Sequence, residues 1–332
     1  MTAAGRACTA VAGTNIALVK YWGKRDPELN LPATGSLSLT LAEMGTRTTV
    51  RFGGVSGGDR VRLGNAPADD RFAWRVSRFL DVIRQQAGHT QSAEVVTENT
   101  VPTAAGLASS ASGFAALALA ASRAAGLSLA PPALSALARI GSGSAARSIF
   151  GGFVEMARGE RPDGSDSFAR PLEESAPWDV RLVIAVTASE AKALGSTAAM
   201  DRTARTSPFY AAWVAGSDAD LVAARAAISS HDLERLGIVA ERSALRMHAT
   251  AMAADPAIIY WNPATLAAMH AVLALRTGGV AAFFTIDAGP HVKVLCEAAQ
   301  APAVAAALAA VPGVQRTLVA SPGQGARVVE EG

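Results

Sequence analysis

Residues 102–113 of the chain read PTAAGLASSASG and run directly into an apolar stretch of helical character, residues 114–125. Side chains this short let a backbone close around a phosphate group, and the N-terminus of the following helix offers free N–H groups. Ser109 and Ser110 add hydroxyls that suit a phosphate or a magnesium ion. The stretch has neither a Gly-Lys-Ser/Thr ending nor Gly-x-Gly-x-x-Gly spacing, and a serine-capped loop before a core helix explains it equally well.

The composition indicates a two-domain protein with substantial cores. The chain has 332 residues, half of them hydrophobic but few of them aromatic. A net charge of +2 without a basic stripe argues against a nucleic-acid partner. The N-terminus does not resemble a signal peptide, and no apolar run approaches the roughly 20 residues of a membrane span. The two cysteines, Cys8 and Cys296, form no pattern, so we expect a reducing, cytoplasmic location without membrane attachment.

Lysine is scarce in this chain. Only four of the 30 basic residues are lysines, namely Lys20, Lys24, Lys192 and Lys293. A chain so rich in arginine should keep lysine mainly where a compact, movable ammonium group is needed. We apply this argument to Lys20 and Lys24, which lie four residues apart, and to Lys192, which lies in a loop of small residues. Lys293 lies on an alternating strand pattern, and we interpret it as a surface lysine retained by chance.

Hydrophobic periodicity and turn residues predict strands and helices in the first half of the chain. Residues 15–41, which Gly and Pro interrupt, are expected to form loops and short strands. The other expected elements are a strand at 7–12, a hairpin of 46–52 with 60–63, a helix at 71–86, a strand at 93–97, helices at 114–125 and 131–140, and a strand at 153–156.

The second half predicts the order β-α-α-α-β-β-α-β, a ferredoxin-like split βαβ arrangement with extra helices. Asn262-Pro263 is a typical helix start, with Asn as the cap and Pro at the first helical position. We place a domain boundary near residue 178 and expect the tail after Ser321 to be mobile.

Two segments bring together groups that suit an anionic ligand. Residues 15–24, NIALVKYWGK, place Lys20, Tyr21 and Lys24 within five positions, although a strand end with extended lysines explains them as well. Residues 142–147, SGSAAR, combine a tight turn, hydroxyls, free N–H groups and Arg147 into an anion cradle, with a structural serine-rich turn as the alternative.

Two further loops carry polar groups after predicted strands. Residues 192–197, KALGST, supply hydroxyls at Ser196 and Thr197, either for a ligand in the cleft between the domains or as an exposed capped loop. Asp287 opens the sequence DAGP directly after an apolar strand. Asp, Gly and Pro favour turns, but a carboxylate placed there also suits the orientation or deprotonation of a hydroxyl beside a phosphoryl donor.

Taken together and in this order, the segments resemble those of the diphosphomevalonate decarboxylases of the GHMP kinase superfamily. The KYWGK and DAGP sequences are far more specific than the phosphate loop, which the whole superfamily shares. The resemblance covers nearly the whole chain, and the segments that carry it are 15–25, 36–40, 102–113, 141–155, 195–197 and 287–290.

The resemblance implies an α+β protein with the GHMP kinase fold. A ribosomal-S5-like N-terminal domain, residues 1–178, would bind ATP, and a ferredoxin-like C-terminal domain, residues 179–332, would complete an active site between the two. Family members are usually homodimers. ATP would bind on the phosphate loop, with Ser110 also near Mg²⁺; the loop residues implied are Pro102, Ala105, Gly106, Leu107, Ala108, Ser109 and Ser110.

The resemblance also implies the reaction, in which mevalonate 5-diphosphate is phosphorylated on its 3-hydroxyl and then loses carbon dioxide to give isopentenyl diphosphate. Asp287 would position the 3-hydroxyl or take its proton, and Lys20 and Arg147 would act with it. The residues implied in substrate binding are Tyr21, Lys24, Ser142, Gly143, Ser144, Arg147, Ser196 and Thr197.

Relatives acting on mevalonate 5-phosphate, or phosphorylating mevalonate at the 3-hydroxyl, remain alternatives, as does a regulator that binds ATP without catalysis. One departure is His291, which follows Pro290 where the family usually has Asn. We interpret it as a tolerated change, with a modest pH dependence near neutrality as the alternative.

Overall fold

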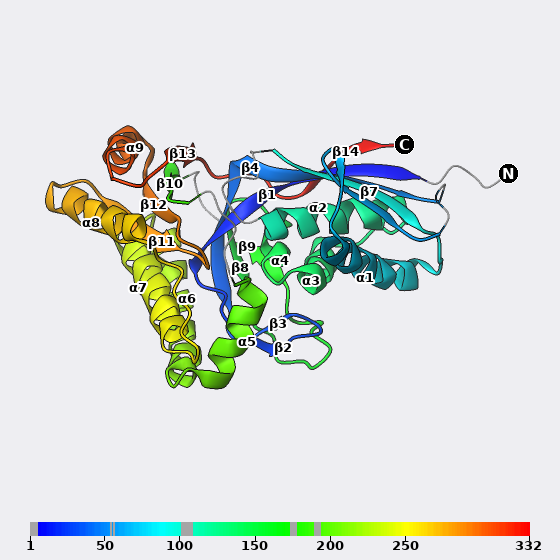
Figure 1. The fold of residues 1–332 in the computed structure, drawn as a ribbon, viewed down its shortest axis with the longest axis horizontal. Coiled ribbons are helices and arrows are strands. Elements are labelled where there is room, and N and C mark those ends of the chain that lie inside the picture. Colours follow the sequence, from blue (N-terminus) through cyan, green and yellow to red (C-terminus); the bar gives the residue numbers. More distant parts are fainter. Residues whose placement is uncertain (1–5, 54, 56, 101–108, 173–177, 189–193) are drawn as a thin grey trace.

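Two long strands, β1 (Ala7–Val19) and β4 (Ser36–Phe52), form the axis of the fold (Figure 1). The computed structural model describes residues 6–53, 55, 57–100, 109–172, 178–188 and 194–332. The two strands pair antiparallel along their length, with register shifts after Gly13 and Ala17. Residues 15–19 and 36–41 therefore belong to long strands rather than to the loops and short strands expected, because irregular pairing lets the sheet continue past Gly13.

The larger sheet has eight strands in the order β14-β1-β4-β7-β5-β6, with β8 and β9 added beside the first part of β4. The added strands in this order are β5 (Arg60–Leu63), β6 (Ala66–Pro67), β7 (Ala93–Asn99), β8 (Phe153–Met156), β9 (Ala169–Pro171) and β14 (Arg327–Glu331). A separate small ribbon pairs β2 (Lys24–Asp26) with β3 (Leu31–Pro32).

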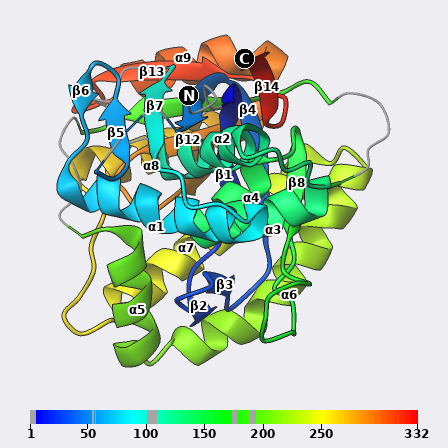
Figure 2. The ribbon, with the colours of Figure 1, turned by 90° about the vertical axis from the view of Figure 1, so that its right-hand side faces the viewer.

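Helices cover one face of this sheet (Figures 1 and 2). They are α1 (Asp70–Ala87), α2 (Ser109–Ala124), α3 (Pro131–Gly141) and the short α4 (Ala145–Ser148). The alanine-rich α2 packs on β1 and β4, where its small side chains allow close approach. α1 begins at Asp69, whose side chain accepts a hydrogen bond from Phe72 N–H, and ends at Gly88, whose φ of 69° suits glycine.

The second sheet has the strand order β11-β12-β10-β13 and is antiparallel throughout. Its strands are β10 (Val180–Val186), β11 (Ala282–Ile286), β12 (Val292–Glu297) and β13 (Arg316–Ala320). Its helices are α5 (Ser196–Thr206), α6 (Tyr210–Ser229), α7 (Leu233–Met252), α8 (Pro263–Thr277) and α9 (Ala301–Ala309). This strand order is the ferredoxin-like one expected, and the Asn262 capping box with Pro263 confirms the predicted start of α8.

The two halves share a hydrophobic core, which fixes the position of the site. Leu18 of β1 and Leu39 of β4 belong to the same buried cluster as Ile184 of β10, Leu236 of α7 and Phe283 of β11. The end of β1 is thereby brought against the second sheet. The other face of that sheet packs separately on α8 and α9.

Two expectations about the chain path are wrong. Strands β4 and β5 do not form a hairpin, because β7 lies between them and pairs antiparallel with β4 and parallel with β5. The segment after Ser321 is not a mobile tail, because β14 pairs with β1 and Gly323 N–H donates to Thr40 O. In both cases the pairing joins residues far apart in sequence, which local turn signals do not encode.

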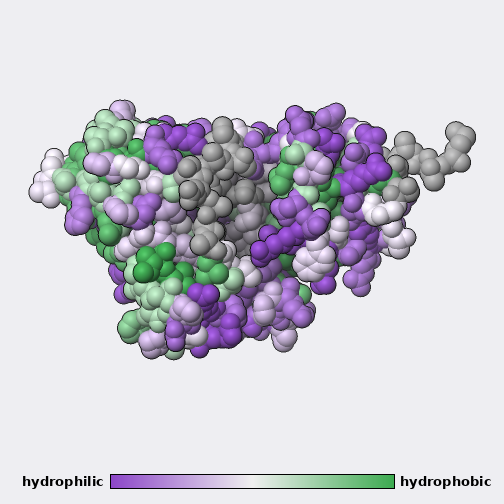
Figure 3. Space-filling view, viewed as in Figure 1, coloured by the Kyte–Doolittle hydropathy of each residue, from purple (hydrophilic) through white to green (hydrophobic). Residues whose placement is uncertain are grey.

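The surface in the view of Figure 1 is mixed in character. Hydrophobic residues gather over the region of α6 and α7 on the left, and hydrophilic residues dominate on the right (Figure 3). Among the described residues, no helix is both long and apolar enough to cross a membrane.

Candidate active site

An ion pair joins the two halves where β1 and β11 end. Lys20 directly follows β1 and Asp287 directly follows β11, and Lys20 Nζ lies 2.6 Å from Asp287 Oδ1. The Lys20 ammonium also donates to Ala17 O at 2.8 Å, and its backbone N–H donates to Ser243 Oγ of α7. Lys20 is only 1% exposed, whereas the Asp287 side chain is 32% exposed. The structure thus brings together two of the predicted catalytic residues and leaves the carboxylate accessible.

Lys293 is a third member of this cluster, and its interpretation as a surface lysine is wrong. It lies on β12, is 4% exposed, and places Nζ 3.2 Å from Asp287 Oδ2. The alternating pattern correctly indicated a strand. However, the face that carries Lys293 is covered by the shared core rather than by water.

The charged groups of this cluster change one another's pKa values. Burial is the largest single influence on Asp287 and raises its pKa, but the charges and hydrogen bonds of Lys20 and Lys293 together outweigh it and hold the pKa well below the usual range. Burial lowers the pKa of Lys20, and Asp287 partly restores it. Asp287 is therefore ionised at neutral pH and is a weak base in the free protein.

Arg147 is buried, and among the described residues no carboxylate is in hydrogen-bonding contact with it. It lies on α4, is 2% exposed, and donates to Ser38 Oγ at 2.9 Å, Ser36 Oγ at 2.6 Å and Asn15 Oδ1 at 3.2 Å. Burial lowers its pKa to about 10, which still leaves it charged. A buried cation whose hydrogen-bond acceptors in the described chain are all neutral is costly, and an anionic ligand would offset that cost.

The serine loop before α4 packs against Tyr21. Ser142 follows α3, and its Oγ lies 3.4 Å from Ser144 Oγ, while Ser144 O accepts a hydrogen bond from Asn15 Nδ2. A side chain at Gly143 would collide with Tyr21 Oη. That hydroxyl is buried and has no hydrogen-bond partner in the described structure, and burial raises its pKa. The structure therefore brings this loop and Tyr21 together, as the sequence predicted.

Lys24 lies at the start of the small β2–β3 ribbon and donates to Asn30 Oδ1 at 2.5 Å. Burial, followed by the nearby charge of Arg75, lowers its pKa to about 8. Arg75 comes from α1, and its Cζ atom lies 5.0 Å from the centre of the Phe114 ring of α2. No feature of the sequence points to Arg75, because an arginine on an amphipathic helix carries no signal of its own.

A cavity opens beside the start of α2. Its lining combines Arg75 and Phe72 of α1, Thr97 of β7, and Ser110 and Gly113 of α2. Ser110 is exposed into this region, and Ser109 forms the first position of α2. The predicted phosphate-loop residues Pro102, Ala105, Gly106, Leu107 and Ala108 lie outside the described residues.

The loop that carries Asp287 is anchored at its far end. Pro290 O accepts hydrogen bonds from Thr187 Oγ1 at 2.9 Å and from Thr265 Oγ1 at 2.6 Å. His291, which is buried, accepts a hydrogen bond from Thr187 N–H at Nδ1. His291 thus takes part in holding the loop, which agrees with its interpretation as a tolerated change near the site.

Ser196 and Thr197 form the first turn of α5, with Ser196 half-buried and Thr197 exposed. Lys192, from the same segment, lies outside the described residues. Their part in binding stays a prediction.

Two family models match this chain. The "Diphosphomevalonate decarboxylase-like N-terminal domain" matches residues 12–169, and the "Mevalonate 5-diphosphate decarboxylase C-terminal domain" matches residues 182–325. The chain belongs to the diphosphomevalonate decarboxylase family. It is 37% identical to the diphosphomevalonate decarboxylase mvd1 of Aspergillus fumigatus and 36% identical to the human diphosphomevalonate decarboxylase. These matches cover 85% and 86% of this chain and 75% of each relative.

Solved structures agree with this family assignment. The mevalonate diphosphate decarboxylase of Staphylococcus aureus superposes with a TM-score of 0.93 at 38% identity, covering 98% of both chains. A complex of the protein MDDEF with MVAPP, AMPPCP and magnesium superposes with a TM-score of 0.91 at 41% identity, covering 98% of this chain and 99% of that one. The predicted α+β GHMP kinase fold is confirmed.

Proposed function

We propose that the chain catalyses the ATP-dependent decarboxylation of mevalonate 5-diphosphate to isopentenyl diphosphate, with release of ADP, phosphate and carbon dioxide. The observation that carries the proposal is the Lys20–Asp287 pair at the junction of the two halves, accompanied by the buried Arg147, whose hydrogen-bond acceptors among the described residues are neutral. Membership of the diphosphomevalonate decarboxylase family supports it.

Arg147 and the neighbouring loop would hold the diphosphate. A guanidinium has five N–H donors, so the three neutral acceptors leave donors for a ligand. Lys24, Tyr21 and the loop of Ser142, Gly143 and Ser144 would complete the cradle. A diphosphate bound there would compensate the buried positive charge and supply the partner that Tyr21 Oη lacks.

Asp287 would orient the tertiary 3-hydroxyl toward the phosphoryl donor. Phosphoryl transfer needs little proton removal early on, so a weakly basic carboxylate suits an orienting role. Lys20 would offset negative charge near the transferring group. Phosphorylation turns the hydroxyl into a good leaving group, its loss leaves cationic character at C3, and the carboxylate then departs as carbon dioxide.

The residues present fit ATP and Mg²⁺. The cavity beside the start of α2 has Arg75 and Ser110 in its lining, and Lys24 lies near Arg75. No group of three His, Cys, Asp or Glu that could hold a metal occurs among the described residues. Magnesium bound mainly by phosphate oxygens and water, with Ser110 as a protein ligand, fits this donor set and would supply charge neutralisation. MDDEF has been solved with AMPPCP and magnesium.

The test is ATP-dependent release of carbon dioxide from mevalonate 5-diphosphate, compared with mevalonate 5-phosphate and mevalonate. We expect release from the diphosphate alone. Preference for another substrate, or ADP without carbon dioxide, would assign a sister activity. D287N should nearly abolish turnover while nucleotide binding, followed with a fluorescent ATP analogue, persists. If D287N kept its turnover, the role of Asp287 would be wrong.

We also propose a homodimer, which the resemblance implies, and a cytoplasmic location and a domain boundary near residue 178, which the sequence itself predicts. Half-exposed apolar residues on α7 and α8, such as Ile238 and Leu266, support a subunit interface. Light scattering of the purified protein tests the dimer, and fractionation of the source cells tests the location.

A further inference from the structure

Lys293 lies at a position where a strand normally carries a core side chain. In the register of the second sheet it is opposite Thr285 of β11 and Ile184 of β10. The neighbouring side chains on this face, Phe283 and Leu295, belong to the hydrophobic core that the two halves share. An ammonium group here must have a partner that offsets its removal from water.

That partner is Asp287, and the pairing is divided between the two carboxylate oxygens. Lys20 contacts Oδ1 at 2.6 Å, and Lys293 contacts Oδ2 at 3.2 Å. The lysines come from different halves of the molecule. Lys20 follows β1 of the large sheet, whereas Lys293 is on β12, the strand that pairs with β11 just before Asp287. A carboxylate with one ion pair at each of its two oxygens cannot rotate freely.

The other ionisable groups that act on this carboxylate are Arg147 of α4 and His248 of α7. Burial and the charge of Lys20 lower the pKa of His248 to about 3, so it is neutral. Among the groups named, Asp287 is the only anion, facing two lysines and an arginine. Removing one lysine therefore changes the balance around Asp287 without creating an unpaired anion.

We propose that Lys293 is a positioning residue that fixes the orientation of the Asp287 carboxylate while the substrate hydroxyl binds. The inference rests on the proposed function for the identity of that hydroxyl. The physical reason for two lysines is geometric, because the Lys20 ion pair holds Oδ1 alone, whereas Lys293 holds Oδ2 as well. Without Lys293, the carboxylate would be free to turn toward Lys20, and its pKa would rise, since Lys293 is one of the two lysines that lower it.

The first experiment measures Asp287 directly and needs no substrate. The protein is labelled with ¹³Cγ-aspartate, and the Asp287 resonance is assigned by its loss in D287N. We expect the wild-type and K293R resonances to share one chemical shift from pH 4.5 to 8, and the K293M resonance to be displaced from it because Oδ2 has lost its charged partner. L295M, which places methionine at the next position of β12 that faces the same core, controls for disturbance of the strand. Should K293M fail to fold, K293Q is titrated instead.

The second experiment separates positioning from direct substrate binding. With K293M we expect kcat at pH 7 to fall about tenfold or more with KM little changed, since a misdirected carboxylate harms the reacting geometry. The acidic limb of the kcat–pH profile should move to higher pH, because loss of Lys293 raises the pKa of Asp287, and K293R should restore it. A raised KM with an unmoved acidic limb would instead make Lys293 a substrate ligand.

An Asp287 resonance in K293M that coincides with the wild-type resonance would overturn the inference whatever the kinetics. Failure of the proposed function would be seen in a different assay, the release of carbon dioxide by wild type. In that case wild type would release no carbon dioxide from mevalonate 5-diphosphate, while the titration would still show whether Lys293 holds Asp287.

Discussion

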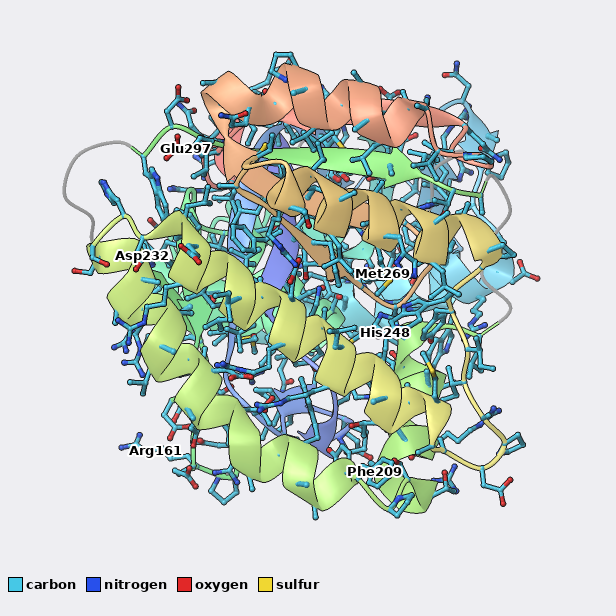
Figure 4. All side chains as sticks on the ribbon, turned by 90° about the vertical axis from the view of Figure 1, so that its left-hand side faces the viewer. Arg161, Phe209, Asp232, His248, Met269 and Glu297 are labelled. Carbon is cyan, nitrogen blue, oxygen red and sulfur yellow. The ribbon has the colours of Figure 1, made fainter. Side chains whose placement is uncertain are left out.

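Replacing His248 by glutamine should remove a built-in acid sensitivity of the fold. His248 lies on α7 and is fully buried (Figure 4). Its Nε2 lies 3.3 Å from Ile286 O, the carbonyl directly before Asp287, so the neutral ring donates from Nε2. Its Nδ1 has no hydrogen-bond partner in the described structure, and the Trp261 ring packs against it. Glutamine can donate to the same carbonyl, but it does not titrate.

The magnitude follows from the pKa of His248, which burial and the charge of Lys20 lower from 6.5 to about 3. Between these two pKa values His248 is protonated in the unfolded chain but not in the folded protein, so the free energy of unfolding decreases as the pH falls. Integrated from pH 7 to pH 4.5, His248 accounts for a loss of about 2.5 kcal/mol. For 332 residues, an unfolding entropy of about 2.1 cal/mol/K per residue converts this into about 3–4 °C in Tm.

The assay is thermal unfolding followed by circular dichroism at pH 7 and pH 4.5. The Tm of wild type should fall by about 3–4 °C more than the Tm of H248Q between the two pH values. H270Q, which changes an exposed histidine on α8, is the matched control and should behave as wild type. If wild type and H248Q lost the same number of degrees, His248 would be accepting a proton inside the folded protein, and our account of its burial would be wrong.

Three further outcomes are expected. G143A should raise KM for mevalonate 5-diphosphate because its methyl group would displace Tyr21, whereas G216A, on an open part of α6, should leave KM unchanged; equal values would place Tyr21 outside the binding site. R147M should weaken binding of the diphosphate in calorimetry by roughly 10²–10⁴-fold, the equivalent of two charge-assisted hydrogen bonds, and an unchanged Kd would make Arg147 purely structural. Substrate affinity should decline as the pH rises through about 8 and Lys24 loses its charge, with K24R retaining affinity to higher pH; a wild-type profile flat to pH 9.5 would contradict this.

The features that the sequence predicted well are local ones. The capping box of Asn262 with Pro263 marks the start of α8, because the residues that satisfy the free N–H groups are adjacent in sequence. The small residues before Arg147 likewise marked a tight turn that contacts Tyr21. In contrast, the predicted hairpin of β4 with β5 failed because β7, which arrives 30 residues after β5 in the chain, takes the place between them.

Arg75 shows why part of the site stayed hidden. Its place on α1 follows from an amphipathic pattern, but its proximity to Lys24 and Phe114 depends on how α1 packs against α2 and the small ribbon. Sequence spacing within one helix contains no information about that packing. Asn15, Ser36 and Ser38 were within the segments that carried the resemblance, yet only the structure shows that they accept hydrogen bonds from Arg147.

Lys293 shows how two sequence arguments of unequal strength conflict. Alternation along β12 reveals a strand but not which of its faces is covered, so it gives no reason to place Lys293 in water. The scarcity of lysine does argue against a surface position for Lys293, because a chain that carries arginine at nearly all its basic positions should keep lysine mainly where arginine is unsuitable. Each described lysine lies in the candidate site, with Lys20 and Lys293 holding Asp287 and Lys24 near Arg75. Composition is the better guide here, because a compact, movable ammonium group suits a close contact with a carboxylate, and both Lys20 and Lys293 make such a contact with Asp287.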